Sequence, residues 1–261
     1  MVKMQIPGKI IAGPLCRREK REKGKKTIFP MEILCYNNSE CLMEEGTKMD
    51  YLSSLLCQAT RLAAEAHDGA CRKGGDLPAI LHAMETAQIV STMTADEDVL
   101  AAAVLHDVLE DTALSEEELR QTVGSHVTDL VLAVTEDKRP AQSAAETWQI
   151  RKQESVERLL GERRLEVKMI VLGDKLSNIR ALQRDYDLLG EQVWERFNNR
   201  NKADQGWYYQ AMTDALQDLN TYPAWRELSS LVWEVFSCDR DSDQLRFDFS
   251  ARNAREMDML W

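Results

Sequence analysis

The stretch 99–112, which reads VLAAAVLHDVLEDT, decides the fold and points to the chemistry of this chain. Its apolar residues are typical of a buried helix. Four ionisable residues interrupt them: His106, Asp107, Glu110 and Asp111. At about 100° per residue, these four side chains are predicted to share one arc of a continuous helix. Burying three carboxylates beside an imidazole is costly unless they are paired, so a positive group must compensate.

The charge around this stretch is strongly one-sided. The chain has 44 acidic and 33 basic residues, a formal net charge of −11. Between Lys73 and Arg120 there are eleven acidic residues and no Lys or Arg. The compensating group is therefore a distant Arg or a metal ion, and a concentration of carboxylates is where a metal cation could bind.

The composition excludes several classes of protein. A pI near 5.0 argues against binding to a nucleic-acid polymer, which needs a basic surface. No apolar run approaches the roughly 20 residues that span a bilayer, so no membrane association is expected. The six Cys residues include no C-x-x-C pair. With no secretory signal pattern, reduced thiols and a cytoplasmic location are predicted.

The hydrophobic period is helical nearly throughout from residue 50 onward, and alternating strand patterns are absent. The sequence therefore predicts an all-α fold, a single bundle of about ten helices. A first helix runs toward His67 and ends at Gly69, and Ser115 with Glu118 forms a capping-box pattern. The further helices are expected over 82–93, 96–111, 115–124, 125–135, 144–160, 165–186, 188–197, 202–219 and 223–236.

Three segments are predicted. Residues 1–48 contain a Lys/Arg cluster without a sustained period and are interpreted as a basic, poorly ordered extension. Residues 49–220 form the main helical domain. Residues 221–261 supply a C-terminal helix and a tail that pack on the domain.

Two more polar residues intrude on apolar helices. His82 follows the apolar triplet 79–81, and Asp174 occupies an inward position on the stripe of Val167, Val171 and Asn178. Alone, such a His is more often a core residue and such an Asp is usually paired with an Arg. Together with His106 and Asp107, however, they form a mixed nitrogen and oxygen set that suits a divalent first-row metal.

The order H…HD…D resembles the metal-binding signature of HD-domain phosphohydrolases. The resemblance is closer to the RelA/SpoT-type hydrolases of guanosine tetra- and pentaphosphate. Their A-H-x-x-x-x-R-K segment is matched by AHDGACRK at 66–73, and H-D-x-x-E-D-T is matched at 106–112. Their L-x-D-[RK]-L-x-N-x-R segment is matched by LGDKLSNIR at 172–180. The similarity covers about residues 50 to 220, and implies a stand-alone hydrolase without a synthetase domain.

The resemblance also implies roles for particular residues. One Mn²⁺ ion would be held by His82, His106, Asp107 and Asp174. Glu110 and Asp111 would position or deprotonate the attacking water. Arg72, Lys73 and Asn178 match nucleotide-contacting positions, and Lys138 is a further cationic candidate for the phosphates. The reaction would split the 3′-diphosphate from the ribose, which gives GDP or GTP and pyrophosphate.

One segment departs from the family pattern. P-Y-[IV]-x-H-P reads PAILHA at 78–83, so Ala79 and Ala83 replace the aromatic residue and the second Pro. This departure favours an alternative, a hydrolase of another phosphorylated nucleotide. A second alternative is a non-catalytic nucleotide or metal sensor, against which the intact Glu110–Asp111 pair argues. The expected ligand is a small anionic nucleotide, and the chain could form a homo-oligomer.

Overall fold

The structure is a computed structural model, described here for residues 16–22, 25–31, 54–72, 76–139 and 141–237. The chain divides into two compact units, Met1–Asp50 and Tyr51–Trp261. In the first unit, β1 (Cys16–Glu22) and β2 (Lys25–Met31) pair antiparallel. The sequence predicts an irregular extension here, because CRREKRE lacks the alternation of apolar and polar residues that indicates a strand. This hairpin is therefore a feature that the pattern did not predict.

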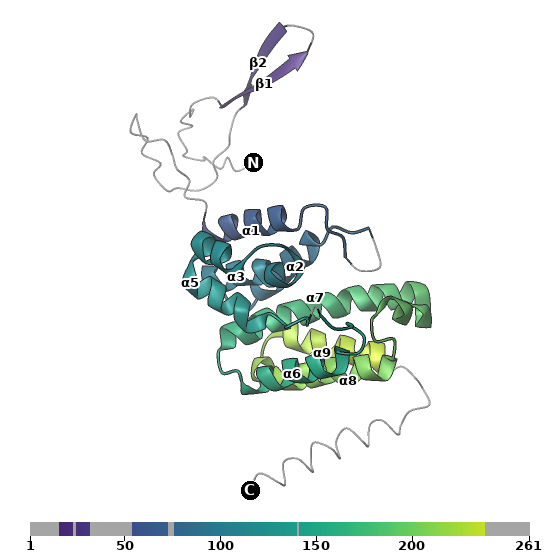
Figure 1. Cartoon of the computed structure of the whole chain (residues 1–261). Coiled ribbons are helices and arrows are strands. Elements are labelled where there is room, and N and C mark those ends of the chain that lie inside the picture. The colour runs from purple at the N-terminus through teal and green to yellow at the C-terminus, as the bar shows by residue number, and fades with distance from the viewer. Residues whose placement is uncertain (1–15, 23–24, 32–53, 73–75, 140, 238–261) are drawn as a thin grey trace, which may run out of the picture. The chain divides into compact units, whose positions relative to one another are not determined.

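The second unit is built from helices, which confirms the predicted all-α fold of the main domain (Figure 1). The α-helices are α1 (Leu55–Ala66), α2 (Ile80–Val90), α3 (Glu97–Leu105), α4 (Val108–Asp111), α5 (Glu116–Val134), α6 (Trp148–Gly161), α7 (Leu165–Leu189), α8 (Lys202–Ala215) and α9 (Pro223–Phe236). Two 3₁₀ helices, η1 (Gly190–Arg196) and η2 (Gln217–Leu219), flank α8.

Local sequence signals explain several boundaries. The capping box is present at the start of α5, where Ser115 and Glu118 bond reciprocally. Gly124 has a φ of 84° inside α5, so the helix is kinked where the sequence predicts one helix to end and the next to begin. Pro223 stands in the first turn of α9, whose bounds equal the predicted range.

The prediction of one continuous helix over 96–111 is wrong. The helix ends at Leu105, and α4 begins at Val108 after a turn at His106 and Asp107. Consecutive residues of a regular helix point about 100° apart. The turn instead brings His106 Nε2 within 3.2 Å of Asp107 Oδ2. The break therefore aims both side chains at one point.

The bounds of other helices also differ from the predicted ones. Residues 188–197 form the end of α7 and the 3₁₀ helix η1 rather than an α-helix. The helix expected over 202–219 is divided into α8 and η2, and the one expected from residue 144 begins at Trp148. In the predicted C-terminal segment, α9 packs against α7 and α8, whereas residues 238–261 lie outside the described part of the chain.

Helix α7 runs between two groups of helices (Figure 1). It packs against α2, α3 and α5 in one group and against α9 in the other, where α6 and α9 contact α8. The approach of α2 to α7 depends on Gly173, because a Cβ there would lie 2.8 Å from Val90 Cγ2 and 3.0 Å from Thr86 O. This close packing sets the distance between the helices that carry His82 and Asp174.

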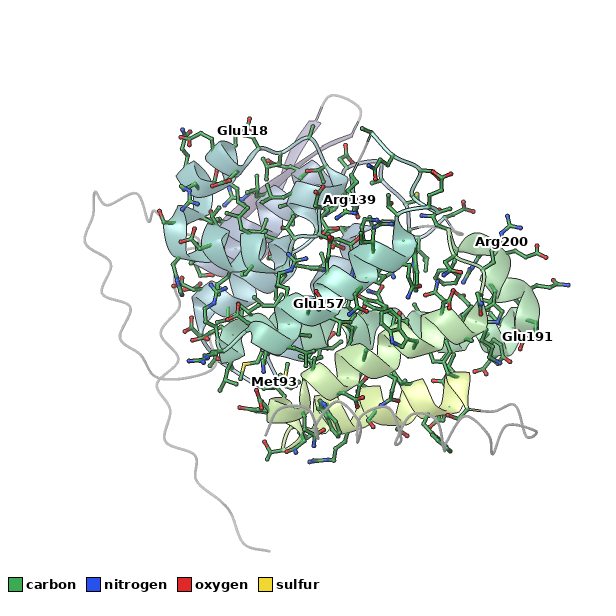
Figure 2. All side chains as sticks on the ribbon, turned by 60° about the horizontal axis from the view of Figure 1, so that its bottom comes forward. Met93, Glu118, Arg139, Glu157, Glu191 and Arg200 are labelled. Atoms are coloured by element: carbon green, nitrogen blue, oxygen red, sulfur yellow. The ribbon has the colours of Figure 1, made fainter. Side chains whose placement is uncertain are left out.

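The apolar core is centred on α3 and α7. The residues from Ala101 to Leu105 are fully buried, and so are Ile170, Leu172 and Ile179 of α7. Charged side chains such as Glu118, Glu157 and Glu191 are exposed on the outer helix surfaces (Figure 2). Within the described residues, no helix combines the length and the apolar character that a membrane span requires.

Candidate metal centre

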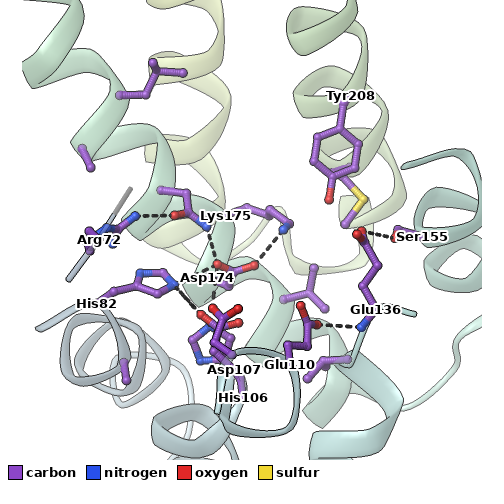
Figure 3. A pocket seen from close by; sticks show the side chains of 18 of the residues that line it. Arg72, His82, His106, Asp107, Glu110, Glu136, Ser155, Asp174, Lys175 and Tyr208 are labelled. Carbon is purple, nitrogen blue, oxygen red and sulfur yellow. Dashed lines mark hydrogen bonds and ion pairs between the residues drawn. The ribbon is translucent and has the colours of Figure 1, made fainter. Parts of the chain in front are cut away.

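Four side chains from separate parts of the sequence converge beside α7 (Figure 3). His82 comes from α2, His106 and Asp107 from the turn between α3 and α4, and Asp174 from the middle of α7. The Nε2 atoms of the two imidazoles lie 3.2 Å apart. Asp174 Oδ1 lies 3.2 Å from His82 Nε2, and Asp107 Oδ2 lies 3.5 Å from the same nitrogen. The structure thus brings together all four residues that the sequence nominates as metal ligands.

This arrangement fits a divalent cation. Ligands about 2.1 Å from a common ion lie roughly 3.0–3.4 Å from one another in octahedral or tetrahedral geometry. The donor atoms lie 3.2 to 3.7 Å apart along the measured pairs. Two imidazole nitrogens and two carboxylate oxygens form a set that suits a first-row metal. The site could therefore hold a metal ion without a large rearrangement.

The two histidines are oriented in different ways. His106 Nδ1 lies 2.9 Å from the carbonyl oxygen of Ala103, so Nδ1 carries the proton and Nε2 faces the centre. His82 Nδ1 lies 2.8 Å from Ser177 Oγ, which donates its proton to Glu85. Ser177 Oγ therefore accepts a hydrogen bond from the protonated Nδ1, which leaves the lone pair of His82 Nε2 for a metal.

The carboxylates of the centre are ionised at neutral pH. Burial opposes ionisation of Asp107, but the adjacent His106 outweighs it and lowers the Asp107 pKa to about 2. Burial likewise opposes ionisation of Asp174, whose pKa is held well below its usual value by Lys175 and the two histidines. Lys175 Nζ lies 2.7 Å from Asp174 Oδ2, so part of the positive compensation comes from the next residue in the chain.

The acidic pair lies beside this centre. Glu110 is mostly buried, and its Oε1 accepts a hydrogen bond of 2.6 Å from the backbone N–H of Glu136. Burial, followed by repulsion from Asp107, raises the pKa of Glu110. Asp111 is about half exposed and is paired with Lys138, whose Nζ also lies 3.4 Å from Glu110 Oε2. Lys138, predicted to contact substrate, is thus bound to the acidic pair.

The predicted nucleotide-contacting residues are partly brought together. Arg72 Nη2 donates a hydrogen bond of 2.7 Å to Asn178 Oδ1, and Asn178 also donates to Asp174. The Arg72–Asn178 pair therefore adjoins the metal centre directly. Lys73 lies outside the described residues.

A cavity of about 870 Å³ includes the centre and the acidic pair. Its other walls come from α6, α7 and α8 and carry Lys152. They also carry Lys175 and Tyr208 (Figure 3). The two ammonium groups lie 5.0 and 5.4 Å from the centre of the Tyr208 ring. The cavity thus joins an acidic metal-binding side to a more basic side, a combination suited to an anionic ligand held partly by a metal.

Sequence reasoning missed several residues that support the site. Ser177 and Glu136 hydrogen-bond to the nominated residues His82 and Glu110, and Glu85 accepts a hydrogen bond from Ser177. Ser177 stands within the quoted motif at 172–180, but at one of its variable positions. Glu136 contributes a backbone N–H, which carries no signal in the residue type. Only the packing of helices distant in sequence shows these roles.

The family model described as HD domain matches residues 59–203, more than half of the chain and all four residues of the centre. This chain belongs to the HD domain family. Two curated relatives align with the HD domain over part of their length. A GTP pyrophosphokinase from Myxococcus xanthus is 32% identical over 122 residues, 46% of this chain and 16% of the relative. The bifunctional (p)ppGpp synthase/hydrolase SpoT from Escherichia coli K12 is 34% identical over 128 residues, 49% of this chain and 18% of the relative. The chain thus spans less than a fifth of the length of these relatives.

Solved structures also resemble this HD domain. One is described as a metazoan ortholog of SpoT that hydrolyses ppGpp, with a TM-score of 0.56 and 27% identity over 70% of this chain and 95% of that chain. Another is lmo0812 from Listeria monocytogenes EGD-e, with a TM-score of 0.53 and 29% identity over 60% of this chain and 99% of that chain. The full lengths of these two solved domains are therefore almost entirely matched.

Proposed function

We propose that this protein is a Mn²⁺-dependent pyrophosphohydrolase that removes the 3′-diphosphate of guanosine tetra- and pentaphosphate. The observation that carries the proposal is the convergence of His82, His106, Asp107 and Asp174 beside the Glu110–Asp111 pair. The similarity to a SpoT ortholog described as hydrolysing ppGpp supports the choice of substrate. We also infer a cytoplasmic location, while a homo-oligomeric state stays a prediction.

In this proposal, His82, His106, Asp107 and Asp174 hold one Mn²⁺ ion. When bound, the ion supplies Lewis-acid polarisation of a phosphoryl oxygen and of water. Glu110 accepts a proton from the attacking water, because its carboxylate is fixed next to Asp107 and is protected from bulk solvent. The water oxygen bonds to the phosphorus as the bond between this phosphorus and the ribose 3′-oxygen breaks, and the proton taken up by Glu110 passes to the leaving oxygen, which gives a ribose hydroxyl and free pyrophosphate.

The residues on the other walls hold the nucleotide. The planar guanidinium of Arg72 is fixed by Asn178 and can stack on a purine. Lys138 and Lys152 line the same cavity and can attract phosphates. Lys138 would then exchange part of its contact with Asp111 for the substrate, because a bound anion competes with that carboxylate.

A second candidate is hydrolysis of another nucleotide that carries a ribose phosphate or diphosphate. It is favoured by Ala79, which lines the cavity where the family pattern has an aromatic residue. A methyl group leaves more room beside His82 than a Tyr ring does. A wider range of nucleotides could therefore enter the site.

The test is to incubate the purified protein with Mn²⁺ and guanosine tetraphosphate and to separate the products by ion-exchange chromatography. Release of GDP and pyrophosphate that disappears in Asp107→Ala is expected. Turnover of other phosphorylated nucleotides alone would favour the second candidate. Metal binding without any turnover would contradict both and indicate a non-catalytic sensor.

A further inference from the structure

The segment after α5, residues 135–139, connects the acidic pair of the cavity wall to helix α6. Glu136 has a mostly buried side chain and stands at the start of this segment, directly after Thr135, the C-terminal cap of α5. Its backbone N–H donates to Glu110 Oε1 at 2.6 Å (Figure 3). Its side chain points the other way, toward α6. Glu136 therefore contacts the acidic pair through its main chain and a different helix through its carboxylate.

The carboxylate of Glu136 is held by three donors of α6. Arg151 and Lys152 form ion pairs with it, the latter at 2.7 Å, and Ser155 Oγ lies 3.2 Å from Oε2 and shares its one proton between this carboxylate and Arg151 O at 2.9 Å. Burial opposes ionisation of Glu136, but Lys152 and Arg151 outweigh it and lower the Glu136 pKa. The carboxylate is thus a charged, fixed anchor.

The donors are themselves fixed. Arg151 is buried, and its other nitrogens donate to Thr147 Oγ1 at 3.2 Å and to Ala144 O at 3.1 Å. Lys152 Nζ lies over the ring of Tyr208. A guanidinium bound at several nitrogens loses little further freedom when it binds a carboxylate. The ion pairs with Glu136 therefore hold the segment after α5 at a fixed place relative to α6.

We propose that Glu136 is a positioning residue for Glu110. Its carboxylate, clamped to α6 by Arg151, Lys152 and Ser155, sets the place of its own N–H, and this N–H fixes the rotamer of Glu110. The position of a backbone N–H group is fixed only as well as the residue that carries it. Displacement of a reacting group by about 1 Å can lower the rate about 100-fold. This inference rests on the proposed function, in which Glu110 accepts the proton.

The experiment compares the wild-type protein with Glu136→Ala and Glu136→Gln. The matched control is Glu154→Gln, because Glu154 of α6 forms a further ion pair with this segment, at 2.5 Å from Arg139 Nη2. The readouts are kcat and KM for guanosine tetraphosphate, the Kd for Mn²⁺ by calorimetry, and the amide proton shift at position 136 by NMR. The last readout needs no activity.

In Glu136→Ala, we expect kcat to fall about 10- to 100-fold while the Kd for Mn²⁺ is unchanged, and KM to fall if it changes, because Lys152 loses its partner and is free to attract phosphates. We expect the amide proton at position 136 to resonate downfield in the wild type, because it donates to a carboxylate, and to move upfield in Glu136→Ala. Glu136→Gln should show a smaller loss, because its amide oxygen can still accept from α6, and Glu154→Gln should show none. If Glu136→Ala does not fold, the inference is tested with Glu136→Gln and Ser155→Ala, for which the same kcat, Kd for Mn²⁺ and amide proton shift are measured.

Two results would overturn the inference: an unchanged amide shift with kcat within about twofold of the wild type, or a loss of kcat matched by weaker Mn²⁺ binding. If the wild-type protein hydrolyses no guanosine tetraphosphate, the proposed function fails. The amide shift in Glu136→Ala then still decides whether the clamp positions Glu110.

Discussion

The two sides of the cavity are held in place by different means. On the metal side, the donor atoms belong to α2, α7 and the turn after α3, and the close packing at Gly173 joins α2 to α7. On the side of the acidic pair, Glu110 depends on a backbone N–H from a segment that is anchored to α6. Substitutions on the first side should therefore change metal affinity, and those on the second side should change turnover with the metal retained.

The largest effect is expected from Asp107→Ala, which removes a ligand and leaves two imidazoles and one carboxylate. We expect Mn²⁺ binding to be lost in calorimetry and hydrolysis to fall to background. Glu117→Gln, an exposed acid on α5, is the control and should behave as the wild type. Retention of Mn²⁺ affinity in Asp107→Ala would remove Asp107 from the ligand set.

Glu110→Gln should distinguish most clearly between an effect on turnover and an effect on metal binding. The amide keeps the size of the side chain but cannot accept the proton, so kcat should fall about 10²- to 10⁴-fold. The Kd for Mn²⁺ should stay near that of the wild type, because Glu110 is outside the ligand set. An unchanged kcat would show that another group activates the water.

Ser177→Ala tests the orientation of His82 on the metal side. Loss of the hydroxyl leaves His82 Nδ1 and Glu85 without their shared partner, and the Kd for Mn²⁺ should rise about 10- to 100-fold. Ser230→Ala, which removes an exposed hydroxyl bonded to Glu234, is the matched control. Equal Mn²⁺ affinities in both variants would contradict the role of Ser177.

The smallest effect on the reaction is expected from Gly173→Ala, which pushes α2 and α7 apart and so lowers the stability of the fold and, to a lesser degree, the affinity for Mn²⁺. A methyl group there would meet Val90 and Thr86, and relief of this overlap should lower the free energy of unfolding by about 1–3 kcal/mol in a urea titration. Gly161→Ala, where no heavy atom lies within 4 Å of the added Cβ, should not destabilise the fold. Similar midpoints in the two variants would show that α2 and α7 can move apart.

The sequence predicted the helical fold and the convergence of the four nominated ligands for a physical reason. Buried helices with ionisable interruptions leave a clear pattern, and His82, His106 and Asp174 each interrupt an apolar stripe. The turn at His106 and Asp107 was missed, because neither Gly nor Pro marks it. Glu136 and Ser177 were missed because their contacts come from helices distant in sequence.

The metal centre itself can be tested by anomalous diffraction at the manganese edge, from crystals of the full chain soaked in Mn²⁺. We predict one strong anomalous peak within coordination distance of His82 Nε2, His106 Nε2, Asp107 Oδ2 and Asp174 Oδ1. A peak bound by a different set of residues, or no peak at this centre, would contradict it.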